Sequence, residues 1–201
     1  MTLKDLKPAL VWDIFDQITK VPRPSKKEEK IIEYLVNFAK ENNIEYKVDG
    51  VGNVAMFKPA TPGCENAPAV VLQSHMDMVC EKASDSTHNF ETDPIETHID
   101  GEWLYANKTT LGADNGIGVA AAMAILADKT LQHGPINCLF TIDEETGLTG
   151  AEALSPELWQ GDILVNLDSE DEGEVFIGCA GGVCNYADFK HEWTEVPEGM
   201  F

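Results

Sequence analysis

Histidine and carboxylate residues that could hold a metal ion follow three apolar segments of this sequence. The segments 70–74, 136–142 and 163–167 each run directly into polar residues, which are His75-Met76-Asp77, Asp143-Glu144-Glu145 and Asp168. A further carboxylate, Asp114, stands at the start of a helical segment. In open α/β sheets, ligands bind beyond the carboxyl ends of the strands. If the three segments are parallel strands, these side chains meet at one edge of the sheet and can bind a divalent cation.

The types of these side chains suit zinc, which binds imidazole nitrogen and carboxylate oxygen at roughly 2.0–2.2 Å. One histidine and three acids are too few for two separate tetrahedral sites. If one carboxylate bridges two ions about 3.5–4 Å apart, the same ligands go further because that carboxylate serves both ions. His75 and Asp77 point to the same face of an extended segment, so Asp77 can hold the second imidazole nitrogen. Glu144 and Glu145 are adjacent and point differently. One of them can bind the metal while the other faces a bound water.

Helical segments alternate with apolar strands, which predicts an α/β fold. Apolar spacing predicts helices at about 6–18, at the segment that follows a capping box of Ser25 and Glu28, at 115–128 and at 150–158. Turn residues and apolar runs predict hairpins at 46–57 and 98–105 and strands at 69–73, 136–142, 163–167 and 174–178. Because the hairpins add antiparallel pairings, we expect a mixed, mostly parallel central sheet flanked by helices.

The composition argues against several kinds of partner and location. The formal net charge of −21 argues against nucleic acid and anionic membranes, because phosphate binding needs clustered lysine and arginine. The longest apolar stretch, 117–127, is shorter than the ~18 residues of a membrane span. Residues 1–20 lack the apolar run of a secretory signal. The five cysteines include no CxxC pair and indicate free, mostly buried thiols in a reducing cytosol, so we expect a cytoplasmic protein.

Four longer segments resemble one enzyme family. The most specific is 110–118, with the sequence TLGADNGIG, and the others are 74–79, 143–147 and 166–170. They resemble the aminoacyl-histidine dipeptidases (Xaa-His dipeptidases, peptidase D), which belong to a wider class of di-zinc amino- and carboxypeptidases. The likeness runs along nearly the whole chain. It implies a zinc-peptidase-like catalytic domain that hydrolyses dipeptides of the Xaa-His type.

The resemblance also implies a role for each candidate metal ligand. Asp114 would be the carboxylate that bridges two zinc ions. His75 and Asp168 would complete one zinc site, and Glu145 would belong to the other. Cobalt or manganese could replace zinc in such a centre.

Two further residues receive catalytic roles from the resemblance. Glu144 would be the general base, which takes a proton from the metal-bridging water during attack on the peptide carbonyl and returns it to the leaving amine. Asp77 would orient His75. The chemistry agrees, because bound zinc lowers the pKa of water towards neutrality and a nearby carboxylate can then accept its proton.

The family pattern extends beyond residues 1–201. Its second zinc site takes a histidine from far downstream, and an inserted lid domain helps to bind substrate and to form a homodimer. We therefore expect this chain to be the N-terminal part of the catalytic domain, without the lid and dimerisation domain and without the C-terminal part. His191 is the last histidine of the sequence, and its surroundings do not resemble the missing motif. Such a chain is expected to bind about one zinc ion and to have little or no peptidase activity alone.

Three other interpretations stay open. Residues 116–121 read as GxGxxA at a helix start, as in dinucleotide-binding proteins. However, no apolar strand leads directly into them, and Asp114 would repel a pyrophosphate. A non-catalytic binding module derived from the family would keep the motifs without the activity. A related carboxypeptidase or deacylase would share the same catalytic residues.

Overall fold

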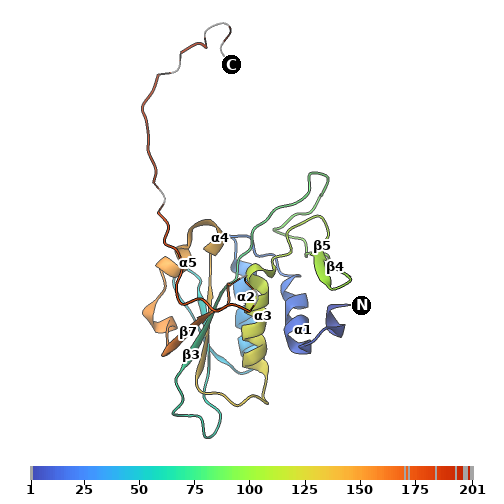
Figure 1. Cartoon of the computed structure of the whole chain (residues 1–201), viewed down its shortest axis with the longest axis vertical. Coiled ribbons are helices and arrows are strands. Elements are labelled where there is room, and N and C mark those ends of the chain that lie inside the picture. Colours follow the sequence, from blue (N-terminus) through green and yellow to red (C-terminus); the bar gives the residue numbers. More distant parts are fainter. Residues whose placement is uncertain are drawn as a thin grey trace. The chain divides into compact units, whose positions relative to one another are not determined.

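Apolar strands within residues 1–168 pair into a mixed sheet. The computed structural model describes residues 2–169, 171, 173–183, 185–192, 194–196 and 199, and in it the strands lie in the order β1-β2-β6-β3-β7 (Figure 1). Their bounds are Glu45–Val48 for β1, Val54–Lys58 for β2, Val70–His75 for β3, Ile136–Thr141 for β6 and Ile163–Asn166 for β7. A second sheet pairs β4 (Thr97–Asp100) with β5 (Trp103–Ala106). The predicted α/β fold with a mixed sheet and both predicted hairpins are confirmed.

The three strands that lead into the candidate ligands are parallel. β3 pairs in parallel with β6 on one side and with β7 on the other. His75 is level with Thr141 of β6, and Gln73 is level with Asn166 of β7. The strands therefore end at the same edge of the sheet, as the sequence predicts, and the residues that follow them emerge side by side.

Helices bury most of the apolar core against one face of the sheet (Figure 1). α2 (Glu29–Glu41) packs on β1 and β2, α3 (Ala113–Ala127) packs on β3 and β6, and α1 (Ala9–Ile18) packs on α3. Burial of a large apolar side chain stabilises the fold by about 1.5–3 kcal/mol relative to exposure to water. This core holds β3 and β6 in place and includes the fully buried Phe15, Ile31, Leu35, Met123 and Phe140.

Short elements cover the opposite face. They are α4 (Glu144–Gly147), α5 (Thr149–Glu152) and a 3-10 turn, Pro156–Leu158, so the single helix predicted at 150–158 is wrong. Pro156 has no backbone N–H and disfavours helical backbone at Ser155, which is extended with ψ of 130°. Leu158 still reaches the sheet, where it packs in a small cluster with Ala55, Val71 and Leu139.

The N-terminal helix starts later than predicted. A 3-10 turn, Leu3–Asp5, comes first, and α1 begins at Ala9 rather than near residue 6. Leu6 and Pro8 have extended backbone, with ψ of 161° and 130°. Pro8 contributes to the shift, because it disfavours helical backbone at Lys7, the residue before it.

The predicted capping box of Ser25 and Glu28 is wrong. α2 begins at Glu29, and no side chain caps its N-terminus. The hydroxyl of Ser25 instead donates a hydrogen bond to Asp77, and the carboxylate of Glu28 accepts one from the backbone N–H of Asp143. Ser25 therefore binds the edge of the sheet at long range, whereas Glu28 accepts the backbone N–H groups of both Asp143 and, just before the helix, Lys26.

Residues Ser169–Phe201 form a unit separate from Met1–Asp168. The strand predicted at 174–178 does not form, and the described residues of this unit hold no strand at all. A strand needs a partner for its backbone N–H and C=O groups, and none of the described strands pairs with this segment. His191 belongs to this unit, where its Nδ1 lies 3.1 Å from the carbonyl oxygen of Phe189.

The cysteines and the helices agree with most of the expectations from composition. Cys64, Cys80, Cys138 and Cys179 are free thiols, and Cys184 lies outside the described residues. Of these four, Cys138 is the buried one, so the prediction of mostly buried thiols is wrong. Within the described part of the chain, no helix has both the length and the apolar character needed to cross a membrane.

Candidate metal centre

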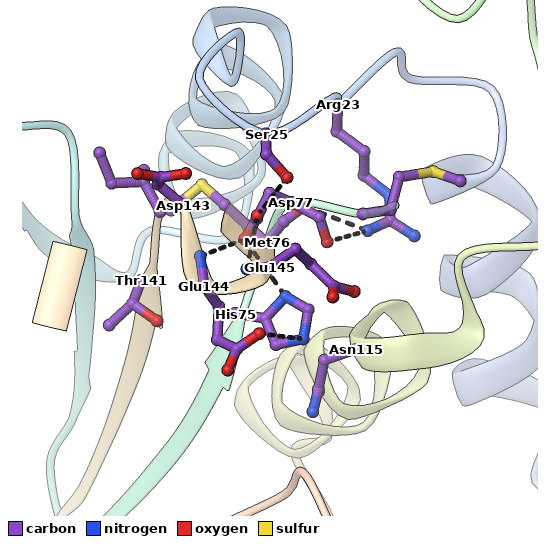
Figure 2. Close-up of polar contacts among 12 residues, drawn as sticks. Arg23, Ser25, His75, Met76, Asp77, Asn115, Thr141, Asp143, Glu144 and Glu145 are labelled. Carbon is purple, nitrogen blue, oxygen red and sulfur yellow. Dashed lines mark hydrogen bonds and ion pairs between the residues drawn. The ribbon is translucent and has the colours of Figure 1, made fainter. Parts of the chain in front are cut away.

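His75 is the last residue of β3 and is almost completely buried, with 1% of its surface exposed. Its Nδ1 lies 3.2 Å from Oδ1 of Asp77, and its Nε2 lies 2.9 Å from Oδ1 of Asp114. In Figure 2 the imidazole ring lies between Asp77 and the carboxylate of Glu144. Asp77 can hold a proton on Nδ1, and Nε2 faces the other carboxylates, so Nε2 can bind a metal once it has lost its own proton.

The remaining predicted carboxylates gather around this nitrogen. Oδ1 of Asp168 lies 3.6 Å and Oε2 of Glu144 lies 4.0 Å from Nε2 of His75. The ligand atoms of His75, Asp114 and Asp168 all lie within 4.8 Å of one another, and so do those of His75, Glu144 and Glu145. The structure therefore brings together the side chains that the sequence proposed as metal ligands. The structure groups Glu145 with His75 and Glu144, whereas the resemblance pairs it with Asp114.

A tight turn after β6 presents the two glutamates. Its first residue, Asp143, has a left-handed backbone with φ of 49°, which aspartate tolerates better than most residues. The carboxylate of Asp143 points away from the His75 ring (Figure 2) and accepts hydrogen bonds from the hydroxyls of Thr146 and Thr149. Its backbone N–H donates to Glu28 at 3.0 Å. The turn is thus held by side chains on both sides and aims the next two residues at the cluster.

The start of α3 and the end of β7 position the two aspartates. Gly112, with φ of 69°, turns the chain into α3, and the peptide bond between Asp114 and Asn115 is cis. Nδ2 of Asn115 donates to the carbonyl oxygen of Leu167 at 3.1 Å and to the carboxylate of Asp168. Asn115 therefore ties together the two segments that carry the aspartates, although nothing in its sequence position distinguished it from a helix residue.

The charges of the cluster shift the pKa values of His75 and Asp77 in opposite directions. Burial lowers the pKa of His75, but its hydrogen bonds to Asp77 and Asp114 outweigh burial and raise it to about 9. Burial raises the pKa of Asp77, but the hydrogen bonds from His75 and Ser25 outweigh it and lower the value to about 2. The pair is thus an imidazolium and a carboxylate at neutral pH when no metal is bound.

The outer carboxylates repel one another. Burial, and then the charges of neighbouring carboxylates, raise the pKa values of Glu144, Glu145 and Asp168 against the opposing effect of His75. A cation placed among them relieves this repulsion. One imidazole nitrogen and several carboxylate oxygens are also the donors that divalent metals such as zinc accept. The residues therefore fit a divalent metal ion.

Comparison with known proteins assigns the family. Residues 71–186, more than half of the chain, match the model of peptidase family M20/M25/M40. The chain belongs to this peptidase family. The matched range contains every residue that the sequence proposed for the site.

Individual M20 relatives extend the match. The cytosol non-specific dipeptidase of Escherichia coli K12 is 49% identical over 98% of this chain. The crystal structure of aminoacylhistidine dipeptidase from Vibrio alginolyticus is 52% identical over 89% of the chain, with a TM-score of 0.87. That of aminopeptidase PepT from Bacillus cereus is 26% identical over 81%, with a TM-score of 0.66. The chain spans 41%, 36% and 43% of the lengths of these three proteins.

Arg23 is a site residue that the sequence did not single out. Its guanidinium is buried and donates hydrogen bonds to the carbonyl oxygens of Met76 at 3.1 Å, Asp77 at 2.9 Å and Gly112. Burial lowers its pKa to about 10, so it still carries its charge at neutral pH. Arg23 therefore links the segment after β3 to the segment before α3 and places a positive charge behind the carboxylates.

The glycines of the M20 chain's TLGADNGIG segment make room for these contacts. A Cβ atom on Gly112 or Gly116 would lie 2.5 or 2.6 Å from Nη2 of Arg23, and one on Gly118 would overlap the side chain of Asn115. No strand leads directly into this helix, because β5 ends at Ala106. The glycines therefore allow close packing within the site. The interpretation of residues 116–121 as a dinucleotide-binding GxGxxA motif loses its support.

We expect Gly116→Ala to destabilise the chain. Alanine in place of a helical glycine normally stabilises by about 0.5–1 kcal/mol. Here the new methyl group meets Arg23, whose guanidinium cannot move without breaking its three hydrogen bonds, and overpacking of this kind costs about 1–3 kcal/mol. The net loss in the free energy of unfolding, measured by urea denaturation with chelator present, is therefore about 0–2.5 kcal/mol.

Gly50→Ala is the matched control. Nothing lies within 4 Å of a Cβ atom at Gly50, so we expect a change within about 0.5 kcal/mol, as at ordinary surface positions. A stabilised Gly116→Ala chain would show that Arg23 gives way easily.

Proposed function

We propose that this chain binds zinc through His75, Asp114 and Asp168, and that the centre hydrolyses dipeptides. The observation that carries the proposal is the position of Nε2 of His75. It lies 2.9 Å and 3.6 Å from oxygens of the two aspartates, while Asp77 holds the other ring nitrogen. A separation of this size between ligand atoms suits one cation placed between them, since zinc contacts each donor at roughly 2.0–2.2 Å.

A second metal position is proposed beside the first, with Asp114 as the bridging carboxylate and Glu145 as a ligand. His75 belongs to both groups of candidate ligands. Its Nε2 is the ring nitrogen that faces the carboxylates, and one nitrogen can serve one ion at a time. The residues described therefore offer one full set of ligands, and we expect about one zinc per chain. Cobalt and manganese accept the same oxygen and nitrogen donors and are expected to substitute.

Glu144 is proposed as the general base. A zinc ion at this edge would polarise the peptide carbonyl and lower the pKa of water. Glu144 then takes the proton of the attacking water and passes it to the leaving amine. In the metal-free chain, burial and neighbouring carboxylates raise the pKa of Glu144. Its partly buried position beside the proposed metal ligands suits a group that must accept a proton and return it. Asp77 keeps the imidazole of His75 oriented throughout.

The substrate class and the location are proposed from the relatives. Two of them are named as dipeptidases, one non-specific and cytosolic, the other an aminoacylhistidine dipeptidase. We propose dipeptides, including those of the Xaa-His type, as substrates, and the cytosol as the location. Because the chain spans 41% of the non-specific dipeptidase, we further propose that it supplies the N-terminal part of a larger catalytic unit.

Zinc titration of the metal-free chain tests the centre. We expect about one tightly bound zinc, with an affinity that rises with pH. His75 is protonated below its pKa of about 9, so zinc must displace a proton from Nε2, and the apparent binding constant should grow about tenfold per unit between about pH 6.5 and 8.5 and then level off. Calorimetry in buffers of different ionisation enthalpy counts the released proton directly.

The raised pKa of His75 also determines how the stability of the metal-free chain changes with pH. Its value is raised from 6.5 to about 9 on folding, so His75 stabilises the fold fully below about pH 6.5 and this contribution is lost as the pH rises through 9. Zinc binding that is independent of pH across that window would argue against His75 as a ligand.

A further inference from the structure

The segment before α2 crosses the carboxyl end of β3 and is firmly anchored there. Pro24 forms a parallel bridge with Met78, and the backbone N–H of Met78 donates to the carbonyl oxygen of Arg23 at 3.1 Å. The buried guanidinium of Arg23 returns two hydrogen bonds to the carbonyl oxygens of Met76 and Asp77. These contacts fix the backbone next to Ser25, so the hydroxyl of Ser25 is delivered to a defined place.

That place is the carboxylate of Asp77, which lies behind His75 with 0% of its surface exposed. Ser25 donates its hydroxyl to Oδ2 at 2.7 Å, as Figure 2 shows. The same oxygen accepts the backbone N–H of Glu145 at 3.3 Å. Oδ1 accepts the backbone N–H of Glu144 at 3.1 Å and lies 3.2 Å from Nδ1 of His75. The bond from Ser25 is the shortest of the four.

We propose that Ser25 is a positioning residue of the metal centre, acting through Asp77 on His75 and on the turn that carries Glu144 and Glu145. This inference rests on the proposed function. Ser25 makes no contact with the reacting groups itself. It holds the carboxylate that orients the imidazole ligand and anchors the backbone of both glutamates.

The effect of the hydroxyl follows from what remains without it. In Ser25→Ala, Oδ2 of Asp77 keeps a single, longer hydrogen bond from the backbone of Glu145, so the carboxylate can rotate about its last torsion angle. Rotation moves Oδ1 away from Nδ1 of His75 and loosens the ring. Removal of partners that orient metal ligands typically weakens metal binding by about 10- to 100-fold, and Ser25 acts one contact further out, so we expect about 10-fold.

The experiment measures the zinc affinity of the 201-residue chain by competition with a chromophoric chelator. Ser25→Ala is compared with Ser25→Thr, which keeps the hydroxyl, and with Ser74→Ala as the matched control. Ser74 lies next to His75 on β3, is fully buried, and its hydroxyl has no hydrogen-bond partner among the described residues. Unfolding of each metal-free chain is measured in parallel, because a merely structural loss lowers stability without changing the zinc affinity.

We expect about 10-fold weaker zinc binding in Ser25→Ala, and binding close to wild type in Ser25→Thr and Ser74→Ala. Tight binding in the wild type with no change in Ser25→Ala overturns the positioning role and leaves the metal centre standing. Equal weakening in Ser25→Ala and Ser74→Ala also overturns it, because loss of any buried hydroxyl would then have the same effect. A wild-type chain that retains no zinc overturns the proposed metal centre and this inference together.

Discussion

Replacement of His75 by alanine is expected to abolish zinc binding. His75 contributes to both groups of candidate ligand atoms and is the imidazole of each. Without it, the carboxylates remain but lack the nitrogen donor that fixes a zinc ion between them. We expect the affinity to fall by more than about 100-fold, beyond the loss typical of an outer partner. Zinc retained per chain after loading and exhaustive dialysis measures this directly.

His98→Ala is the control for this measurement. His98 lies on the exposed β4–β5 hairpin, where its ring stacks on Tyr105 at 5.5 Å between centroids, so its loss should leave zinc binding unchanged. Because His75 is buried, its removal can also weaken the fold, and Asp168→Asn provides a second, milder test of the same ligand set. Full zinc retention by both His75→Ala and Asp168→Asn would rule out this centre.

Much of the cluster could be predicted because parallel strands end at the same edge of a sheet, so the residues that follow them lie close together. Each of β3, β6 and β7 is a short, mostly apolar strand, and a candidate ligand stands at its last residue or within three residues after it. Parallel pairing alone then brings His75 level with Thr141 and places Asp168 beside it. For the ligands that follow these strands, no long-range knowledge was needed beyond the direction of three strands, whereas Asp114, at the start of α3, is not placed by strand direction.

The residues that support the cluster were not predictable in the same way. Arg23, Ser25 and Asn115 act through contacts with residues 52 to 89 positions away. Ser25 followed by Glu28 carries the local signal of a helix cap, and the tertiary contact with Asp77 overrides it. The glycine spacing in TLGADNGIG was a usable signal, since it indicates backbone that another group approaches closely, but it does not say which group.

The strand predicted at 174–178 does not form for a different reason. Its composition is strand-like, but strand formation depends on a neighbour rather than on the segment alone. β7 shows the contrast: Ile163, Leu164 and Val165 are each at least 40% exposed, yet they form a strand because β3 supplies hydrogen bonds along one side. Local pattern therefore predicts which segments can be strands, and pairing decides which of them are.

Glu144→Gln is expected to abolish turnover while zinc binding persists. The amide has the shape of the carboxylate but cannot accept a proton, and general base catalysis typically contributes about 10²–10⁴-fold to the rate. We expect kcat for a dipeptide to fall by about that factor in any preparation of this protein that shows turnover. Oε2 of Glu144 lies 4.0 Å from Nε2 of His75, farther than the oxygens of Asp114 and Asp168 at 2.9 Å and 3.6 Å. The proposed ligand set therefore survives the change.

Glu152→Gln is the matched control, because Glu152 is an exposed glutamate on the neighbouring α5. Its kcat should equal that of the wild type. The pH profile adds an independent test: kcat/KM of the wild type should fall at acid pH as the base is protonated, and this acid limb should be lost in any residual activity of Glu144→Gln. Loss of zinc in Glu144→Gln would instead make Glu144 a ligand, in the group that it forms with His75 and Glu145. The base would then have to be sought elsewhere at this edge of the sheet.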